Sequence, residues 1–305
     1  MFARRASSVI WKNMATKEDI QAHYDLDNDF FALFLDNNYR IYSCGVWQSA
    51  TSLEEAQQHK LARLGKFAQL EEGQKVLDVG CGWGGLMRYI TDQYPQSKVH
   101  GLTLSEAQFK YIQSVPKAGI SVELRSWQDF PAPEKKFDAI ISIGAFEHFA
   151  SMDDHIHSRN RQIYADFFDW CRMVSTNDAH VGLQTIVINR APIDIGEVRD
   201  SRYLLEKVFP GSALPSVSDI QAALVDRYEI VELRLIGQDY ARTLAEWNTR
   251  LIANRDKIIA RYGEAVFNHY RTYFDAAKRT FESGFVDLLQ VSLRRPKTIK
   301  IHSTK

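Results

Sequence analysis

Four closely spaced glycines follow a short apolar run in the segment KVLDVGCGWGGL, residues 75–86. Val76, Leu77 and Val79 predict a buried strand, and residues 86–94 predict the helix that follows it. Glycine tolerates positive φ angles and carries no Cβ, so main-chain atoms of such a turn can approach a ligand closely. The segment therefore predicts a strand, a ligand-binding turn and a helix.

The spacing of these glycines bears on which cofactor the turn binds. NAD, FAD and S-adenosylmethionine all bind at glycine-rich turns between a strand and a helix. Gly80, Gly82 and Gly84 follow the tighter G-x-G-x-G spacing, although Gly85 keeps the dinucleotide pattern formally present. Asp78 precedes the turn, where a carboxylate opposes a pyrophosphate but accepts from an ammonium group. This favours the amino-acid end of S-adenosylmethionine, with a plain connecting turn as the alternative.

Composition excludes several other classes of protein. The 38 Lys and Arg residues balance 38 Asp and Glu residues, so no overall basic field attracts nucleic acid. Cys44, Cys81 and Cys171 lack C-x-x-C spacing, which favours a reducing compartment and argues against a structural zinc site. No apolar run approaches the roughly 18 residues of a membrane-spanning helix, and no secretory signal is recognisable. We therefore expect a cytoplasmic protein without a metal site.

Strand-like runs alternate with amphipathic helices along the chain, which is typical of a doubly wound sheet. The expected strands are 75–80, 98–102, 121–124, 138–143, 181–189, 229–236 and 286–294. Seven strands whose last two can pair antiparallel predict an α/β fold, the class I methyltransferase variant of the Rossmann-like architecture.

Three further segments are expected around this core, which we place at residues 61–305. Residues 1–60 predict a helical, aromatic N-terminal lid. Prolines interrupt the pattern at about 190–220 and predict a substrate cap. A helical insertion is expected at about 240–283, where seven aromatic side chains between 247 and 281 either line an acyl tunnel or pack between helices.

Seven further motifs follow one another along the chain: HYDLDNDFF (23–31), YSC (42–44), SLEEAQ (52–57), GLTLS (101–105), FEH (146–148), FPG (209–211) and YARTL (240–244). They occur in the order found in cyclopropane fatty acid synthases, and the chain resembles that family over nearly its whole length. It is similar in size to the mycolic acid cyclopropane synthases, and plant coclaurine-type N-methyltransferases share some of its motifs.

The resemblance implies a cofactor site for S-adenosylmethionine. The end of the second strand carries GLTLS and lacks the acidic residue that usually binds the ribose hydroxyls. The implied cofactor-binding residues are Tyr42, Ser43, Asp78, Gly80, Gly82, Thr103, Leu104, Gln108, Ser126, Trp127, Gln128 and Ile143. From sequence alone, Trp127 also fits an ordinary core position and Gln108 an exposed helix face.

The resemblance also implies a reacting centre that holds a bicarbonate ion. Main-chain amides near Cys44 and Ile186, the side chains of Glu147 and Tyr240, and a histidine of the fifth strand are its implied ligands. Here Gln184 replaces that histidine within the sequence Leu-Gln-Thr-Ile. The replacement exchanges a titratable imidazole for a neutral amide that still donates and accepts hydrogen bonds.

Methyl transfer to an alkene carbon generates a carbocation, which must then lose a proton. Aromatic faces such as those of Tyr24, Phe146 and Tyr240 stabilise a cation by roughly 0.5–2 kcal/mol each, too little to replace a base. If Gln184 has displaced bicarbonate, Glu147 is the leading acid–base candidate. Its alternative role is that of an ordinary carboxylate that caps nearby amides.

Two local features depart from the family pattern. Residues 149–161 are long and polar, and we expect a solvated loop or a partner surface there. His155 and His157 within it lack a third spaced ligand, so a metal site is the lesser alternative. Residues 175–178 read Ser-Thr-Asn-Asp and are expected to form a turn before the fifth strand.

The sequence therefore predicts an S-adenosylmethionine-dependent C-methyltransferase or cyclopropane-forming methylene transferase. Its expected acceptor is an unsaturated apolar compound, such as an acyl or prenyl chain, free or carrier-bound. N-methylation of a small amine is the main alternative, and a non-catalytic cofactor-binding scaffold is a lesser one. Peripheral membrane contact and homo-oligomer formation stay open.

Overall fold

A computed structural model describes residues 27–296, and over this range the chain forms one seven-stranded sheet. Its strand order is β3-β2-β1-β4-β5-β7-β6, and β7 runs antiparallel to both of its neighbours. The strands are β1 (Lys75–Val79), β2 (Lys98–Thr103), β3 (Ile120–Leu124), β4 (Phe137–Ile143), β5 (Ser175–Ile188), β6 (Glu229–Leu235) and β7 (Val286–Arg294). The predicted α/β fold and all seven predicted strands are confirmed.

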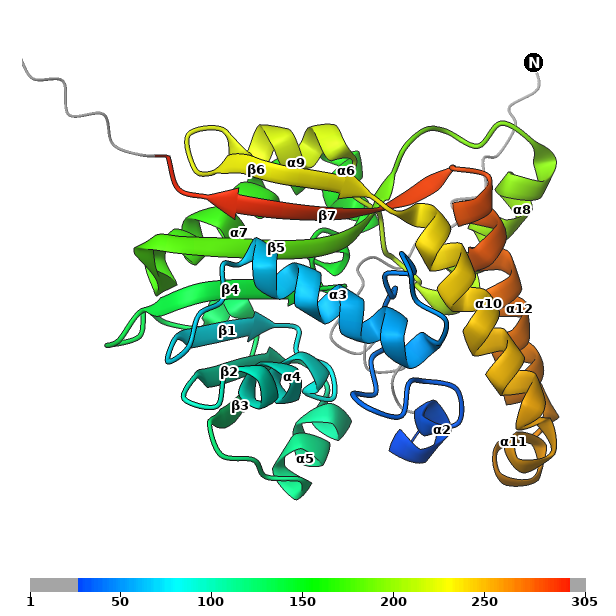
Figure 1. The fold of residues 1–305 in the computed structure, drawn as a ribbon. Coiled ribbons are helices and arrows are strands. Elements are labelled where there is room, and N and C mark those ends of the chain that lie inside the picture. The colour runs from blue at the N-terminus through cyan, green and yellow to red at the C-terminus, as the bar shows by residue number, and fades with distance from the viewer. Residues whose placement is uncertain (1–26, 297–305) are drawn as a thin grey trace, which may run out of the picture.

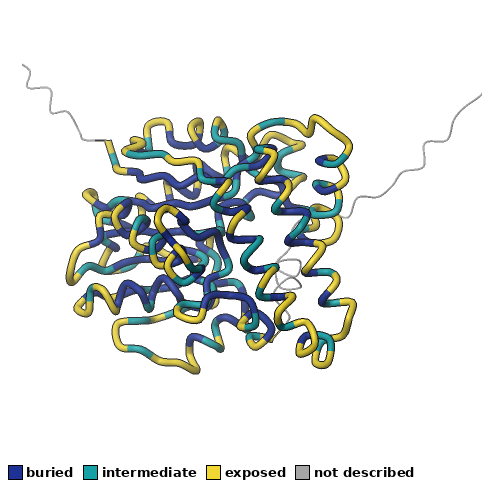
Figure 2. The backbone as a smooth tube through the Cα atoms, turned by 45° about the vertical axis from the view of Figure 1, so that its right-hand side comes forward, coloured by how far each residue is buried: buried dark blue, intermediate teal, exposed yellow. Residues whose placement is uncertain are grey.

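Helices cover both faces of the sheet because alternate side chains of each strand point to opposite faces. On β4, Ala139 and Ile141 pack with α3 (Leu53–Phe67), α4 (Gly85–Gln93) and α5 (Glu106–Ser114). Ile140 points the other way and packs with α7 (Asn160–Val174) and α9 (Val217–Leu224). The central strands are buried on both faces, which explains their nearly continuous apolar sequence. Figure 2 shows this buried interior between exposed loops.

A third group of helices stands beyond the carboxyl ends of the parallel strands (Figure 1). It consists of α2 (Asn28–Ala32), α10 (Gly237–Ala253), α11 (Arg255–Tyr262) and α12 (Glu264–Glu282). Their aromatic side chains pack on one another: the Phe34 ring, just after α2, lies 5.3 Å from the Phe274 ring and 6.3 Å from that of Trp247. The aromatic residues of the helical insertion therefore form a packing core.

Helix α3 joins the N-terminal segment to the sheet. The expected boundary at residue 60 falls within this helix, which packs against β5 and β7. A Cβ on Gly182 of β5 would lie 2.9 Å from the Leu64 carbonyl oxygen, so only glycine allows this approach. Ser292 of β7 donates to the Phe67 carbonyl oxygen at 2.7 Å. These contacts anchor the end of α3 on the sheet.

Two local predictions are wrong. Residues 175–178 do not form a turn but belong to β5, whose pairing shifts so that Phe137 faces Ser175 while Ala139 faces His180. The extra residues are absorbed as an irregularity of the strand. Residues 149–161 are not a plain loop, because they contain the short helix α6 (Met152–Ile156), which begins with a capping box of Ser151 and Asp154.

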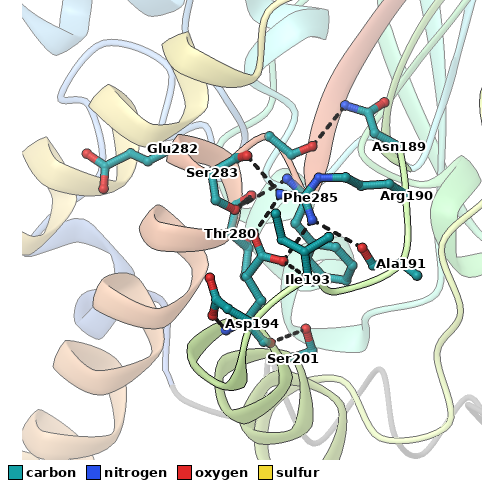
Figure 3. A network of polar contacts seen from close by, with 12 residues as sticks. Asn189, Arg190, Ala191, Ile193, Asp194, Ser201, Thr280, Glu282, Ser283 and Phe285 are labelled. Carbon is teal, nitrogen blue, oxygen red and sulfur yellow. Dashed lines mark hydrogen bonds and ion pairs between the residues drawn. The ribbon is translucent and has the colours of Figure 1, made fainter.

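The cap after β5 contains helix α8 (Ile195–Tyr203), followed by a π-helical turn at Leu204–Val208. Polar contacts hold the segment in place (Figure 3): Arg190 bonds both carboxylate oxygens of Glu197 at 2.8 and 2.6 Å and also donates to the Ser283 carbonyl oxygen. On the next turn, Arg279 of α12 bonds both oxygens of the buried Asp200.

Helix α8 buries acidic side chains and exposes apolar ones, which is the reverse of an ordinary amphipathic helix. Its acids Glu197 and Asp200 are buried, whereas Ile195 is 88% exposed and Val198 is 51% exposed. Charge-assisted hydrogen bonds therefore secure the buried side of α8 to α12.

We predict that Arg279→Met lowers the free energy of unfolding by about 1–3 kcal/mol, because it leaves the buried Asp200 carboxylate short of its charged donors. The urea midpoint of the purified protein measures this change. Arg202→Met removes an exposed arginine that pairs with Glu206 of the adjoining π-helical turn, and it should cost less than about 0.5 kcal/mol. Equal midpoints for the two variants would contradict the anchoring role of Asp200.

Candidate active site

A cavity of about 430 Å³ opens at the carboxyl ends of β1 and β4. The strand order reverses between these two strands, and open α/β sheets bind their ligands at such a reversal. All twelve residues predicted to bind the cofactor line this one cavity, although they come from segments between positions 42 and 143. We call it the switch-point cavity.

The glycine turn forms the floor of the cavity at the end of β1. Gly80 has a φ of 80°, and a Cβ there would lie 2.5 Å from the Ala145 Cβ. Gly82 has a φ of 55°, but a Cβ there would meet no atom of the described residues within 4 Å. Gly80 thus needs to be glycine for packing, whereas Gly82 leaves free space on the ligand side of the turn.

Asp78 lies at the end of β1 with 2% of its surface exposed. Burial raises the pKa of this carboxyl to about 7, against the opposing effect of the positive charge on Lys60. Its Oδ2 atom has no hydrogen-bond partner among the described residues. A buried acceptor without a partner is costly, so the site fits a ligand that brings a donor such as an ammonium group.

The end of β2 supplies a neutral polar pair in place of an acid. Thr103 donates to the side-chain oxygen of Gln108 at 2.9 Å, and its hydroxyl accepts from the Ser105 amide. Gln108 is buried and lines the cavity, so the alternative of an exposed helix face is wrong. Sequence spacing alone did not distinguish the two, because the packing of α5 against the sheet decides which of its side chains face the cavity.

Trp127 satisfies both interpretations made from the sequence. Its ring packs against Phe149, Phe167 and Trp170, with centroid distances of 5.4, 5.3 and 5.7 Å. The same side chain lines the cavity beside Ser126 and Gln128. Trp127 is therefore a core tryptophan with one edge or face available to a ligand.

Lys60 is a residue of the cavity wall that the sequence analysis missed. It is fully buried on α3 and donates from Nζ to the Ser43 hydroxyl at 2.8 Å. Burial lowers the pKa of this lysine to about 8. A sequence signal existed, because Lys60 stands between Ala56 and Leu64 in the apolar stripe of α3, where a lysine is unexpected.

Glu147 is the one carboxylic acid among the described members of the predicted reacting centre, which are Cys44, Glu147, Gln184, Ile186 and Tyr240. It is 4% exposed, and burial raises the pKa of its carboxyl to about 7. The Thr185 hydroxyl donates to its Oε2 at 2.9 Å. Thr185 was not among the predicted residues, because only strand pairing brings it beside Glu147.

Gln184 is buried on β5, where its side-chain oxygen accepts from the Gln290 amide at 2.7 Å. The side-chain oxygen of Gln290 in turn accepts from Arg63 at 3.1 Å. The Nε2 atom of Gln184 has no partner within residues 27–296. A chain of hydrogen bonds thus fixes the Gln184 side chain and leaves its buried Nε2 donor available to a ligand.

The other members of the reacting centre lie in the helical layer and on β5. The Tyr240 ring is 4.5 Å from the Phe281 ring. Thr243, one turn further along α10, accepts from the Gly45 amide at 3.1 Å and so holds the loop that carries Cys44. None of the five described members lines the switch-point cavity, and Tyr24 lies outside the described residues.

The histidines of the site region serve other contacts. His148 lines the cavity, and burial lowers its pKa to about 4, so it is neutral at ordinary pH. His155 contacts the Tyr164 hydroxyl at 3.2 Å, and His157 contacts the Asp153 carbonyl oxygen at 2.9 Å. Among the described residues, no three His, Cys, Asp or Glu side chains gather in a metal-binding arrangement. Nor does that part of the chain contain a helix long and apolar enough to cross a bilayer.

Comparison with known proteins agrees with this geometry. Residues 11–291 match the family described as mycolic acid cyclopropane synthetase. Cyclopropane mycolic acid synthase 3 of Mycobacterium tuberculosis (strain CDC 1551 / Oshkosh) is 35% identical over 91% of this chain and 96% of its own length. The S-adenosylmethionine-dependent methyltransferase UmaA of M. tuberculosis (strain ATCC 25618 / H37Rv) is 32% identical over 91% and 97%.

A solved structure of mycolic acid cyclopropane synthase CmaA1, complexed with SAH and CTAB, superposes with a TM-score of 0.82. It is 30% identical, and the match covers 92% of this chain and 99% of that one. The chain therefore belongs to the mycolic acid cyclopropane synthetase family and is an S-adenosylmethionine-dependent methyltransferase of the cyclopropane synthase type.

Proposed function

We propose that this enzyme transfers a methyl or methylene group from S-adenosylmethionine to a carbon of an unsaturated lipid chain. The observation that carries the proposal is an Asp78 oxygen without a partner in residues 27–296, next to a glycine turn where a Cβ on Gly82 would meet no described atom within 4 Å. The names of the relatives, cyclopropane mycolic acid synthases, support a lipid acceptor.

Different parts of the switch-point cavity bind the two ends of the cofactor. Asp78 and the turn at Gly80 and Gly82 take its amino-acid end, while Thr103 and Gln108 face the nucleoside. When bound, S-adenosylmethionine supplies an electrophilic methyl group on a positively charged sulfur. The remaining predicted residues, Tyr42, Ser43, Leu104, Ser126, Trp127, Gln128 and Ile143, complete the wall and exclude water.

The reacting centre handles the proton that a methylated alkene must lose. Glu147 suits this task because burial brings its pKa to about 7, so the carboxylate can take up a proton near neutral pH. The Thr185 hydroxyl orients the carboxylate. Positive charge that develops on the acceptor is stabilised by the face of Tyr240, by about 0.5–2 kcal/mol.

Bicarbonate fits the same centre as a second, optional base. The buried Nε2 of Gln184 is a donor without a partner among the described residues, and a bound anion would satisfy it. The main-chain amides of Gly45 and Ile186 already donate to Thr243 and Glu147, so a bound anion would share these donors. In this arrangement Gln184 replaces an imidazole as a donor but cannot accept a proton.

Label transfer tests the proposal. The enzyme, incubated with methyl-labelled S-adenosylmethionine, is offered unsaturated acyl chains, prenyl compounds and small amines. We expect label on carbon of an unsaturated chain, located by mass spectrometry of the product. Label on nitrogen of an amine alone would refute carbon transfer in favour of N-methylation, for which the near-neutral Glu147 is also a suitable base.

Glu147→Gln should lower kcat by about 10²- to 10⁴-fold, because it removes the general base, and should leave cofactor affinity unchanged. In the wild type, kcat should rise as the pH passes about 7, where the Glu147 carboxyl loses its proton. This limb of the pH profile should vanish in the variant. Glu134→Gln, an exposed acid, is the control. A pH limb that persists in Glu147→Gln would assign the base elsewhere.

Gln184→His should increase the bicarbonate dependence of turnover or the share of cyclopropane product, because it restores a titratable acceptor at the position where the family has a histidine. Gas chromatography of the acyl products with and without added bicarbonate measures both. Gln58→His on the exposed face of α3 controls for a general effect of an added histidine. Unchanged product and unchanged bicarbonate response would show that residue 184 does not direct the reaction.

A further inference from the structure

Lys60 is a buried cation for which the reaction chemistry described above has no use. Its side chain is fully buried and lines the switch-point cavity from α3. The Ser43 hydroxyl, 2.8 Å from Nζ, is its one hydrogen-bond partner in the described part of the chain. Within that part, no carboxylate lies within 4.0 Å of Nζ.

An ammonium group in this position is incompletely compensated. It carries three donors, and one neutral hydroxyl satisfies one of them. Burial of a charge is costly unless the charge is paired and hydrogen-bonded. The site therefore has capacity for an anion that reaches it through the cavity.

The nearby acids do not fill this capacity. Asp36 is buried, but its oxygens already accept from the backbone amides of Tyr39, Arg40 and Ile41 at 2.6–3.2 Å. Asp78 interacts with Lys60 through space without forming an ion pair, and one of its oxygens stays unpartnered among the described residues. Lys60 and Asp78 thus present opposite charges to one cavity, and each keeps hydrogen-bonding capacity for a ligand.

Opposite charges held apart on one wall complement a zwitterion. An α-amino acid carries an ammonium and a carboxylate on the same carbon, so it can engage an acid and a lysine together. The hydroxyl of Ser43, which Lys60 already contacts, lies on the same wall and can share the carboxylate.

We propose that Lys60 binds the α-carboxylate of the cofactor's amino-acid end, while Asp78 accepts from its ammonium group. The inference rests on the proposed function, because it requires S-adenosylmethionine or its demethylated product in the switch-point cavity. It adds a cofactor-binding residue from α3, outside the strand ends that supply the glycine turn.

Calorimetry with S-adenosylhomocysteine and its decarboxylated analogue tests the role of Lys60. Lys60→Met should lower the affinity for S-adenosylhomocysteine by about tenfold to a hundredfold, as expected for loss of a charge-assisted hydrogen bond. The decarboxylated analogue should bind wild type and variant within about twofold of each other, since it lacks the group that Lys60 contacts. Lys66→Met removes an exposed lysine from the same helix and should change neither affinity.

Asp78→Asn provides the converse measurement. This variant should have a lower affinity for S-adenosylhomocysteine. Its affinity for a deaminated analogue, which keeps the carboxylate, should stay within about twofold of wild type. Lys60→Met should instead lower the affinity for that deaminated analogue. The two variants should therefore show opposite preferences between the two analogues.

Equal weakening of S-adenosylhomocysteine and its decarboxylated analogue by Lys60→Met would overturn the inference, because the lysine would then act only by supporting the cavity wall. Unchanged affinity for S-adenosylhomocysteine would overturn it as well. Circular dichroism verifies folding, and Lys60→Gln replaces Lys60→Met if the latter does not fold. Failure of the wild type to bind S-adenosylhomocysteine would instead refute the proposed function itself.

Discussion

The reversal of strand order between β1 and β4 is the constraint on which the site depends. β1 leads to β2 and β3 on one side, whereas β4 leads to β5 on the other, so the connections diverge above the ends of β1 and β4. The divergence leaves the crevice that becomes the switch-point cavity. Asp78 and the glycine turn reach it from β1, and Ile143 reaches it from β4.

Polar groups of the cap and of the site differ in how completely they are paired. In the cap, Glu197 and Asp200 each receive two hydrogen bonds from an arginine, and these bonds hold the segment. In the site, Asp78 and Gln184 each keep a buried atom without a partner among the described residues. The acids of the cap are thus satisfied by the protein, whereas the site groups keep bonding capacity for a ligand. A buried polar atom without a partner calls for an explanation, and a bound ligand supplies one at this site.

Burial also sets the chemistry of the site acids. Asp78 and Glu147 both have a pKa of about 7, but their surroundings differ. Lys60 faces the same cavity as Asp78 and favours its ionised form, as a partner for an ammonium requires. Glu147 has a hydroxyl donor and backbone amides around it, and no cation among the described residues shifts its pKa. In the proposed function, a buried carboxylate therefore serves binding at Asp78 and proton transfer at Glu147.

Sequence periodicity predicted all seven strands. The central ones are apolar runs buried between two helical layers, whereas the edge strands β3 and β6 are exposed or half-buried over most of their length. The glycine spacing and Asp78 indicated the cofactor, and resemblance to a family supplied the remaining cavity residues. Residues 175–178 were mispredicted because side chains that favour turns can also be accommodated in a strand irregularity. The helix α6 was missed because its five residues are too short for a periodic signal.

Only the tertiary structure decided which side chains share a buried environment. Thr185 meets Glu147 across 38 positions of sequence, and Gln290 meets Gln184 across 106, so no local pattern relates them. Lys60 stood in the apolar stripe of its helix, but its meaning depends on Ser43 and Asp78, which reach it through the packing of α3 on the sheet. A sequence determines which segments must be buried, since burial follows local hydrophobicity. Which polar groups are left unpaired in the interior is decided when distant segments come together.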